Sequence, residues 1–151
     1  TALENINSII SAFNGHVDGI VFGRVDFTLS ANLPRSDIQS SYVCDSALQV
    51  SSICKENDLE FVLGGGVSVD SIDFLKQVSN IRLDRFETRK CILDSSVLFS
   101  DNIENLLQDC VLAELLWLKS KSCTYSSNSL EDRLRVEMLE KRHLYNISAC
   151  D

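Results

Sequence analysis

The fold is decided by residues 17–26, which read VDGIVFGRVD. The centre of this stretch, Gly19 to Gly23, is β-branched, aromatic and bounded by glycine. A short continuous apolar run of this kind is typical of a buried strand in a parallel sheet. We therefore predict a buried strand over residues 17–25. The charged residues that follow Gly23 then lie near the carboxyl end of this strand.

Helical and strand patterns alternate on both sides of this stretch. Before it, apolar residues at helical spacing predict an amphipathic helix over residues 1–13, which Gly15 can end. After it, we predict a loop over 27–40, a helix over 41–56, a strand over 60–63, a helix from Ser68 or Asp70 through Val78, and a strand within 81–93. Strands separated by helices pair in parallel through right-handed crossovers. The pattern therefore predicts an α/β fold.

The last third of the chain is predicted to be helical. Asp101 or Asn102 can cap a helix that runs through Lys121. Residues 122–128 form a polar break, and a further amphipathic helix covers 129–145, with Ser129 and Asp132 resembling a capping box.

Composition excludes several classes of partner. The chain has 151 residues and a net charge of -8, with 22 acidic residues against 14 basic ones. This balance argues against nucleic acid and against an anionic membrane surface, because both require a basic footprint. No apolar run approaches the roughly 20 residues that a membrane helix needs. We expect the six cysteines to be reduced in a cytoplasmic protein, without a zinc site.

Chemistry is expected at the carboxyl ends of the strands, where reactive groups gather in parallel α/β folds. Three stretches fall there: residues 23–26, 64–66 and 87–90. Asp26 offers the oxygen ligand that hard divalent cations prefer. Arg24 and Arg89 can each bind a carboxylate through a planar fork.

Structural readings of the same residues remain open. Asp26 can equally be a loop cap or an ion-pair partner, and residues 64–66 can be a plain turn from strand to helix. Glu87 can form a structural ion-pair cluster with Arg89 and Lys90.

The chain resembles the aldolase/citrate lyase family of the phosphoenolpyruvate/pyruvate barrel superfamily. The resemblance rests on ALENI (residues 2–6), VDGIVFGRVDF (17–27), GGG (64–66) and FETRK (86–90), which match in order and spacing. It spans most of residues 1–121. Leucine is commoner in the family where Phe27 stands.

The resemblance implies a partial (β/α)₈ TIM barrel, with residues 1–121 as its later part and 122–151 as a C-terminal helical extension. It implies a lyase that cleaves or forms carbon–carbon bonds in a 2-oxo acid or related carboxylate, through an enolate stabilised by Mg²⁺ or Mn²⁺. Asp26 would be a metal ligand. Gly23, Val25 and Asp26 would bind substrate, with the backbone amides of Val25 and Asp26 facing its carboxylate. Arg24 and Arg89 are weaker candidates for catalytic residues.

Parts of the family's pattern are absent from this sequence. Its other metal carboxylate and its substrate-binding arginine come from strands that would precede Thr1. A complete barrel needs roughly 250 residues and eight strands, whereas we count three strands here.

These absences leave one alternative, a non-catalytic half-barrel or oligomerisation module, since we expect the long C-terminal helices to support a homo-oligomer. The order of strands and helices alone also allows a complete, small doubly wound domain.

Overall fold

The computed structural model describes residues 2–13, 15–124 and 130–148, without the side chains of 122–124 and 142–148. It contains two compact units, Thr1–Ser100 and Asp101–Asp151, which are treated separately below. The first unit is an α/β structure with an open, mostly parallel four-stranded sheet. The predicted fold class is thereby confirmed at the level of α/β, whereas the predicted barrel and its boundaries stay predictions.

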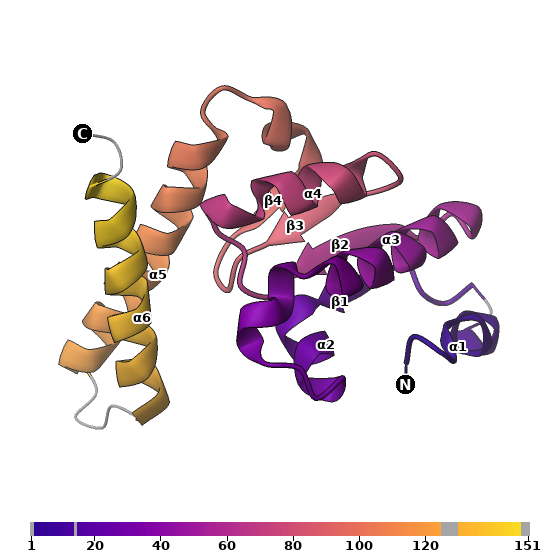
Figure 1. Ribbon diagram of the computed structural model, residues 1–151, viewed down its shortest axis with the longest axis horizontal. Helices are drawn as coiled ribbons and strands as arrows, with labels where there is room; N and C mark the ends of the chain where they lie inside the picture. Colours follow the sequence, from indigo (N-terminus) through magenta and orange to yellow (C-terminus); the bar gives the residue numbers. More distant parts are fainter. Residues whose placement is uncertain (1, 14, 125–129, 149–151) are drawn as a thin grey trace. The chain divides into compact units, whose positions relative to one another are not determined.

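The sheet follows the order of the chain, β1-β2-β3-β4 (Figure 1). Its strands are β1 (Gly19–Gly23), β2 (Glu60–Gly64), β3 (Arg85–Glu87) and β4 (Ile92–Asp94). The first three pair in parallel, as predicted, but β4 pairs with β3 antiparallel. The stretch 81–93 therefore contributes to a hairpin, and its second strand was not predicted.

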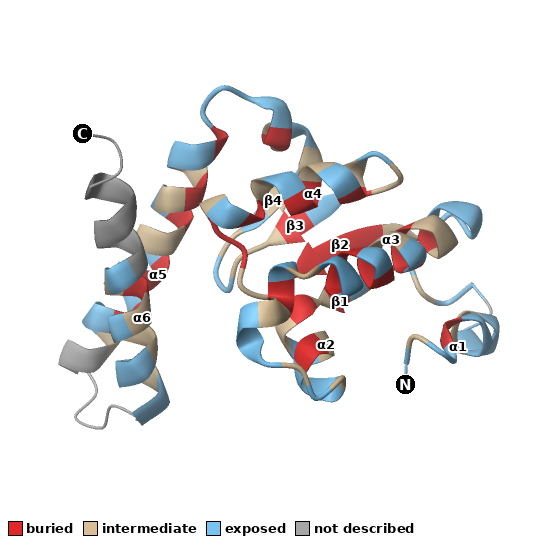
Figure 2. Cartoon of the chain, in the orientation of Figure 1, coloured by how far each residue is buried: buried red, intermediate tan, exposed pale blue. Residues whose placement is uncertain are grey.

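The two faces of the sheet differ in burial. One face carries Phe22, Phe61, Leu63 and Phe86, which are buried beneath the helical layer (Figure 2). Helix α3 (Ser41–Glu56) contacts β1 and β2, and α4 (Ile72–Ser79) packs against α3, so both crossover helices lie on this side.

The opposite face, called the glycine face below, consists of Gly19, Val21 and Gly23 of β1, Glu60, Val62 and Gly64 of β2, and Arg85 and Glu87 of β3. Register partners in a sheet direct their side chains to the same side, which is why these residues share one face. Val21 at its centre is 61% exposed.

The chain turns into a helix directly after β1, so the predicted loop over 27–40 is wrong for residues 27–30 and 35–39 and holds only for 31–34 and 40. Helix α2 (Arg24–Ser30) is followed by the short 3₁₀ helix η1 (Arg35–Gln39). Pro34 and the many Ser, Asn and Asp residues suggested a loop here, but the hydroxyls of Thr28 and Ser30 donate to helical carbonyls. Thr28 Oγ1 donates to Val25 O at 2.9 Å, and Ser30 Oγ donates to Phe27 O at 2.8 Å. The predicted strand is correspondingly shorter and ends at Gly23.

The other helices of this unit follow the predicted pattern closely. Helix α1 covers Ile6–Phe13, and α3 has the predicted bounds, with Ser40 Oγ accepting from Val43 N at its start. Ser68 caps the short 3₁₀ helix η2 (Val69–Ser71) that leads into α4. A further 3₁₀ helix, η3 (Ser95–Phe99), was not predicted.

The second unit is a pair of contacting helices, α5 (Ile103–Thr124) and α6 (Leu130–Ser148). Leu115, Leu118 and Leu139 form its buried cluster, and Arg135 donates to both carboxylate oxygens of Glu114 at 2.8 and 2.9 Å.

The predicted polar break is wrong at residues 122–124, where α5 continues. Residues 125–129, including the predicted cap Ser129, lie outside the described residues. None of the described helices is long and apolar enough to span a membrane.

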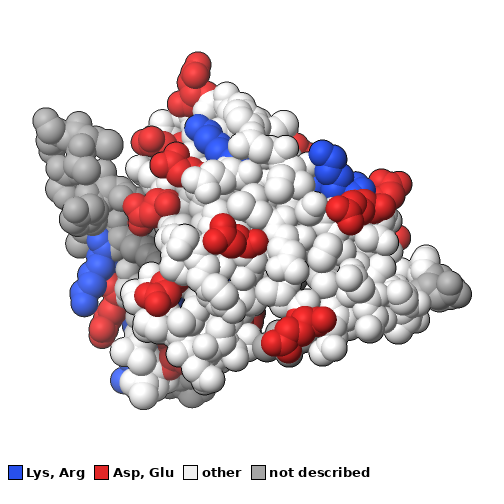
Figure 3. Space-filling model, turned by 45° about the vertical axis from the view of Figure 1, so that its right-hand side comes forward, with Lys and Arg blue, Asp and Glu red and all other residues white. Residues whose placement is uncertain are grey.

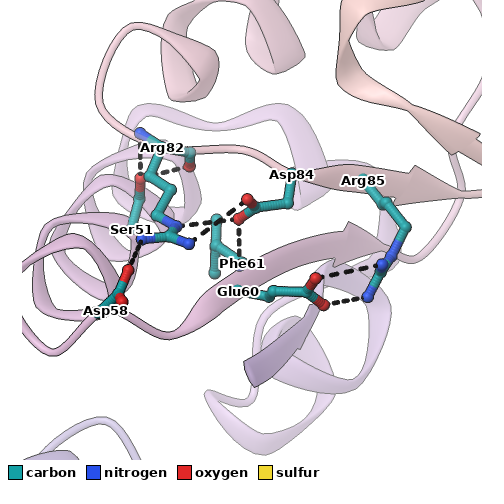
Figure 4. Close-up of polar contacts among 7 residues, drawn as sticks. All are labelled: Ser51, Asp58, Glu60, Phe61, Arg82, Asp84 and Arg85. Carbon is teal, nitrogen blue, oxygen red and sulfur yellow. Dashed lines mark hydrogen bonds and ion pairs between the residues drawn. The ribbon is translucent and has the colours of Figure 1, made fainter. Parts of the chain in front are cut away.

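Polar groups at the amino ends of β2 and β3 are occupied by a structural network (Figure 4). Arg82 donates to Asp84 at 3.0 Å and to Asp58 at 3.3 Å. Asp84 Oδ2 also accepts from the backbone N–H of Phe61 at 2.7 Å, while Arg85 pairs with Glu60. This network fixes the start of each strand, so these charges serve the fold.

Cysteines contribute to the packing. Among the described residues Cys44, Cys54, Cys91 and Cys110 are free thiols. Burial raises the pKa of Cys54 to about 11 and also raises the pKa of Cys44. Both thiols therefore stay protonated at neutral pH and behave as small apolar groups.

Candidate functional site

The carboxyl ends of the three parallel strands form one row of the glycine face. Gly23 pairs with Gly64, and the β2–β3 register continues from Leu63 and Phe86 to place Glu87 beside Gly64. Two adjacent glycines thus leave room above the sheet at the edge where ligands bind in parallel α/β folds. This is the rim to which the sequence assigned chemistry.

Two carboxylates lie over this row. An added Cβ on Gly23 would be 2.7 Å from Oδ2 of Asp26, and one on Gly64 would be 2.8 Å from Oε1 of Glu87. Neighbouring strands are about 4.8 Å apart, so the two carboxylates occupy adjacent places on one face. Asp26 comes from the first turn of α2 and is exposed, while Glu87 ends β3 and is partly buried.

Sequence reasoning placed Glu87 in a possible ion-pair cluster with Arg89 and Lys90 and did not connect it with Asp26. The alternation of side chains in β3 could have revealed the connection. It places Arg85 and Glu87 on the face shared with Gly64, once the register of β2 and β3 is known.

The turn after β2 packs tightly beneath α2. Gly65 has φ +87°, and an added Cβ there would be 2.7 Å from the backbone nitrogens of both Arg24 and Val25. Glycine is needed for both reasons, since this conformation and this close approach disfavour any side chain. The structure therefore places the Val25 amide, predicted to face a substrate carboxylate, directly against Gly65.

Arg24 is fully buried, although the sequence suggested it as a catalytic residue. Its Nη1 donates to Gln39 Oε1 and its Nη2 to Ser71 Oγ, each at 3.0 Å. Its guanidinium also lies 4.9 Å from the centre of the Phe74 ring. These contacts join the start of α2 to η1, η2 and α4, so its placement favours a structural role over contact with a substrate.

Arg89 lies in the turn between β3 and β4 and is exposed. Thr88 closes this turn, because its N–H donates to Cys91 O and its Oγ1 accepts from Cys91 N at 3.0 Å. The turn continues β3 beyond Glu87, so Arg89 stands at the same edge of the sheet as the two carboxylates. Its predicted role in substrate binding stays a prediction.

A groove runs along the outer edge of β1. It encloses about 750 Å³ and is lined by all of β1, by apolar side chains of α1, and by Asp26 and Phe27 of α2. Asp26 thus stands where this groove and the glycine row meet.

The residues present fit a hard divalent cation through carboxylate oxygen alone. The described residues contain no group of three or more His, Cys, Asp or Glu side chains that could hold a metal ion. Mg²⁺ is commonly bound through one or two carboxylates, with water and substrate completing the shell. Asp26 and Glu87 can supply such a donor set.

Comparison of the chain with family models, curated proteins and solved structures found no match. Its function is therefore inferred from the site and from the sequence resemblance.

Proposed function

We propose that the chain is the later part of a (β/α) barrel enzyme, a carbon–carbon lyase or aldolase that acts on a 2-oxo acid or related carboxylate. The observation that carries this proposal is the pair of carboxylates, Asp26 and Glu87, on one face at the carboxyl edge of parallel strands. Both crossover helices lie on one side of the sheet, and the strands follow the order of the chain. This arrangement suits a barrel segment better than a doubly wound sheet, which has helices on both faces.

Each residue has a distinct part in the proposed chemistry. Asp26 and Glu87 hold Mg²⁺ or Mn²⁺ through oxygen, and Arg89 pairs with a carboxylate of the substrate. The bound ion would supply Lewis-acid stabilisation of the enolate that forms when the carbon–carbon bond breaks. Gly23 and Gly64, which lack side chains, leave room for the carboxylates of Asp26 and Glu87 above the strand ends. Arg24 holds α2, and with it Asp26, against the rest of the unit.

The test is a titration of the full chain with Mn²⁺, in which unbound Mn²⁺ is measured by electron paramagnetic resonance. We expect a single site whose affinity falls by at least about tenfold in Asp26→Asn and in Glu87→Gln, because each loses an oxygen ligand. Asp45→Asn is the matched control, since Asp45 is exposed on α3, and it should bind Mn²⁺ as the natural chain does. Circular dichroism checks that the variants are folded.

Activity provides the second readout. A protein that also supplies the strands before Thr1 should release pyruvate from a 4-hydroxy-2-oxo acid when Mn²⁺ is present, and Asp26→Asn should abolish that release. Equal Mn²⁺ affinity in Asp26→Asn and the unchanged chain would remove Asp26 from the metal site.

A second candidate function is a non-catalytic assembly module. It is favoured by the exposed apolar side chains of the second unit, Leu116 and Trp117 on α5 and Leu130 and Leu134 on α6. Absence of Mn²⁺ binding together with a stable oligomer in sedimentation would support this module over the lyase.

A further inference from the structure

Helix α6 has two sides with different surroundings. One side packs on α5, where Leu139 is 1% exposed and Arg135 binds Glu114. The other side is exposed, and its four residues, called the α6 stripe below, are Leu130, Leu134, Glu137 and Lys141. Steps of four, three and four residues place these side chains in one line along the helix, as in the seam of a coiled coil.

The two leucines make the α6 stripe a surface that favours association. Leu130 is 66% exposed and Leu134 is 57% exposed. They lie about one helical turn apart, so a single partner helix can cover both of them. Removing leucine side chains from water is favourable, which gives such a pairing its driving force.

The two charged residues determine the direction of pairing. Helix α6 runs from Leu130 to Ser148, so Leu139 is its middle residue, and Glu137 and Lys141 lie two residues before and after it. If two α6 helices pair antiparallel about their middles, Glu137 of each copy lies opposite Lys141 of the other. Parallel pairing would instead place like charges opposite each other. Because charges across a helix pair set its orientation and partner choice, the stripe matches itself only in the antiparallel arrangement.

The charge of the whole helix favours a second copy over a strongly charged partner. Helix α6 contains four acidic and four basic residues, whereas the chain contains 22 and 14. The acidic excess therefore lies outside α6, and on the face seen in Figure 3 described acidic residues are spread widely, whereas basic ones gather in few places. A helix without net charge attracts neither a basic nor an acidic partner overall. The charges of the stripe also oppose insertion into a membrane, because a buried charge needs a partner.

We propose that the α6 stripe joins two copies of this chain, with the two helices antiparallel across a two-fold axis beside Leu139. The dimer buries Leu130 and Leu134 of both copies against the partner helix and forms two ion pairs between Glu137 and Lys141. In an isologous interface of this kind the same patch serves both copies. The proposal specifies an interface that neither candidate function supplies, and it does not depend on metal binding.

The test is sedimentation equilibrium of the full chain in EDTA, with a reducing agent that keeps the cysteines from linking copies. We expect a monomer–dimer equilibrium. Glu137→Lys and Lys141→Glu should each weaken the dimer by at least about tenfold, because each change places like charges opposite each other twice in the dimer. The double variant Glu137→Lys/Lys141→Glu should recover the original affinity, and an equimolar mixture of the two single variants should form heterodimers.

Two further variants separate the stripe from a general effect of charge. Glu104→Lys makes the same change of charge at an exposed position of α5 and should leave the dimer affinity unchanged. Leu134→Ser alters no charge but removes an apolar contact, so it should weaken the dimer. Circular dichroism checks that every variant keeps its helices.

Three outcomes would overturn the proposal. One is a chain that stays monomeric at about 1 mM, where even a weak interface associates, since the stripe would then be covered by the same chain or would serve another partner. Another is a dimer whose affinity is the same in Glu137→Lys and in Leu134→Ser, which would place the interface elsewhere. The last is a double variant that stays as weak as the single ones. EDTA keeps all of these results independent of Mn²⁺, so failure of the metal proposal would not alter them.

Discussion

Replacing Arg24 with Ala should lower the free energy of unfolding of the first unit by about 3 kcal/mol or more. The side chain is fully buried, and its removal would take away the donors to Gln39 Oε1 and Ser71 Oγ. It would also leave a cavity against Phe74, whose ring the guanidinium now contacts. A domain of this size has a free energy of unfolding of about 5–15 kcal/mol, so this loss is a large share of the total. Urea unfolding followed by circular dichroism measures it.

Two variants make this prediction specific. Arg24→Lys keeps the charge but lacks the planar fork that reaches both partners, so it should recover only part of the loss. Arg35→Ala, at an exposed position of η1, should change stability by no more than about 0.5 kcal/mol. Equal midpoints for Arg24→Ala and Arg35→Ala would show that the buried guanidinium does not hold these segments together.

Replacing Gly65 with Ala should destabilise the same unit by about 2–4 kcal/mol. Part of the cost is conformational, since φ is +87° at this position. The rest is steric, because the new Cβ would lie 2.7 Å from the backbone nitrogens of Arg24 and Val25. Backbone atoms cannot rotate away as a side chain can, so the start of α2 would have to shift. Mn²⁺ affinity should fall as well, since Asp26 belongs to that helix.

Gly15 provides a matched control for the steric part. It also has a positive φ, +79°, but an added Cβ there would meet no atom within 4 Å. Gly15→Ala should therefore show the conformational cost alone, about 1–2 kcal/mol. If urea unfolding gave the same loss for Gly15→Ala and Gly65→Ala, the close approach of Gly65 to α2 would have no energetic consequence.

The parts of the fold that the sequence predicted correctly are those with a strong periodic signal. The helix 41–56 was predicted with its bounds because Val43, Ala47, Val50 and Cys54 repeat at helical spacing. The structure adds that Ser40 caps its start. The loop over 27–40 was predicted from Pro34 and from Ser, Asn and Asp residues, and it was wrong where α2 and η1 form. Hydroxyl side chains favour a loop only when they compete with the backbone hydrogen bonds of a helix. Here Thr28 and Ser30 bond to carbonyls of the same helix.

The candidate site was predicted only in outline. The sequence placed Asp26, Gly64 and Glu87 after or at the ends of strands, and the structure brings them to one edge of the sheet. It could not show that Arg24 turns into the interior, because that depends on Gln39 and Ser71, which are distant in sequence. The placement of Asp26 and Glu87 on one face of the sheet likewise depends on the register of three strands, which no local pattern specifies.

The hairpin of β3 and β4 has a consequence for how the sheet can grow. Antiparallel β4 occupies the edge of β3, through the pairs Arg85 with Asp94 and Glu87 with Ile92. In a closed barrel that edge has to receive a parallel strand. If the proposed barrel forms, its next strand therefore has to replace β4 at this edge. While β4 is paired with β3, a strand that joins this side of the sheet can pair only with β4 and not with β3.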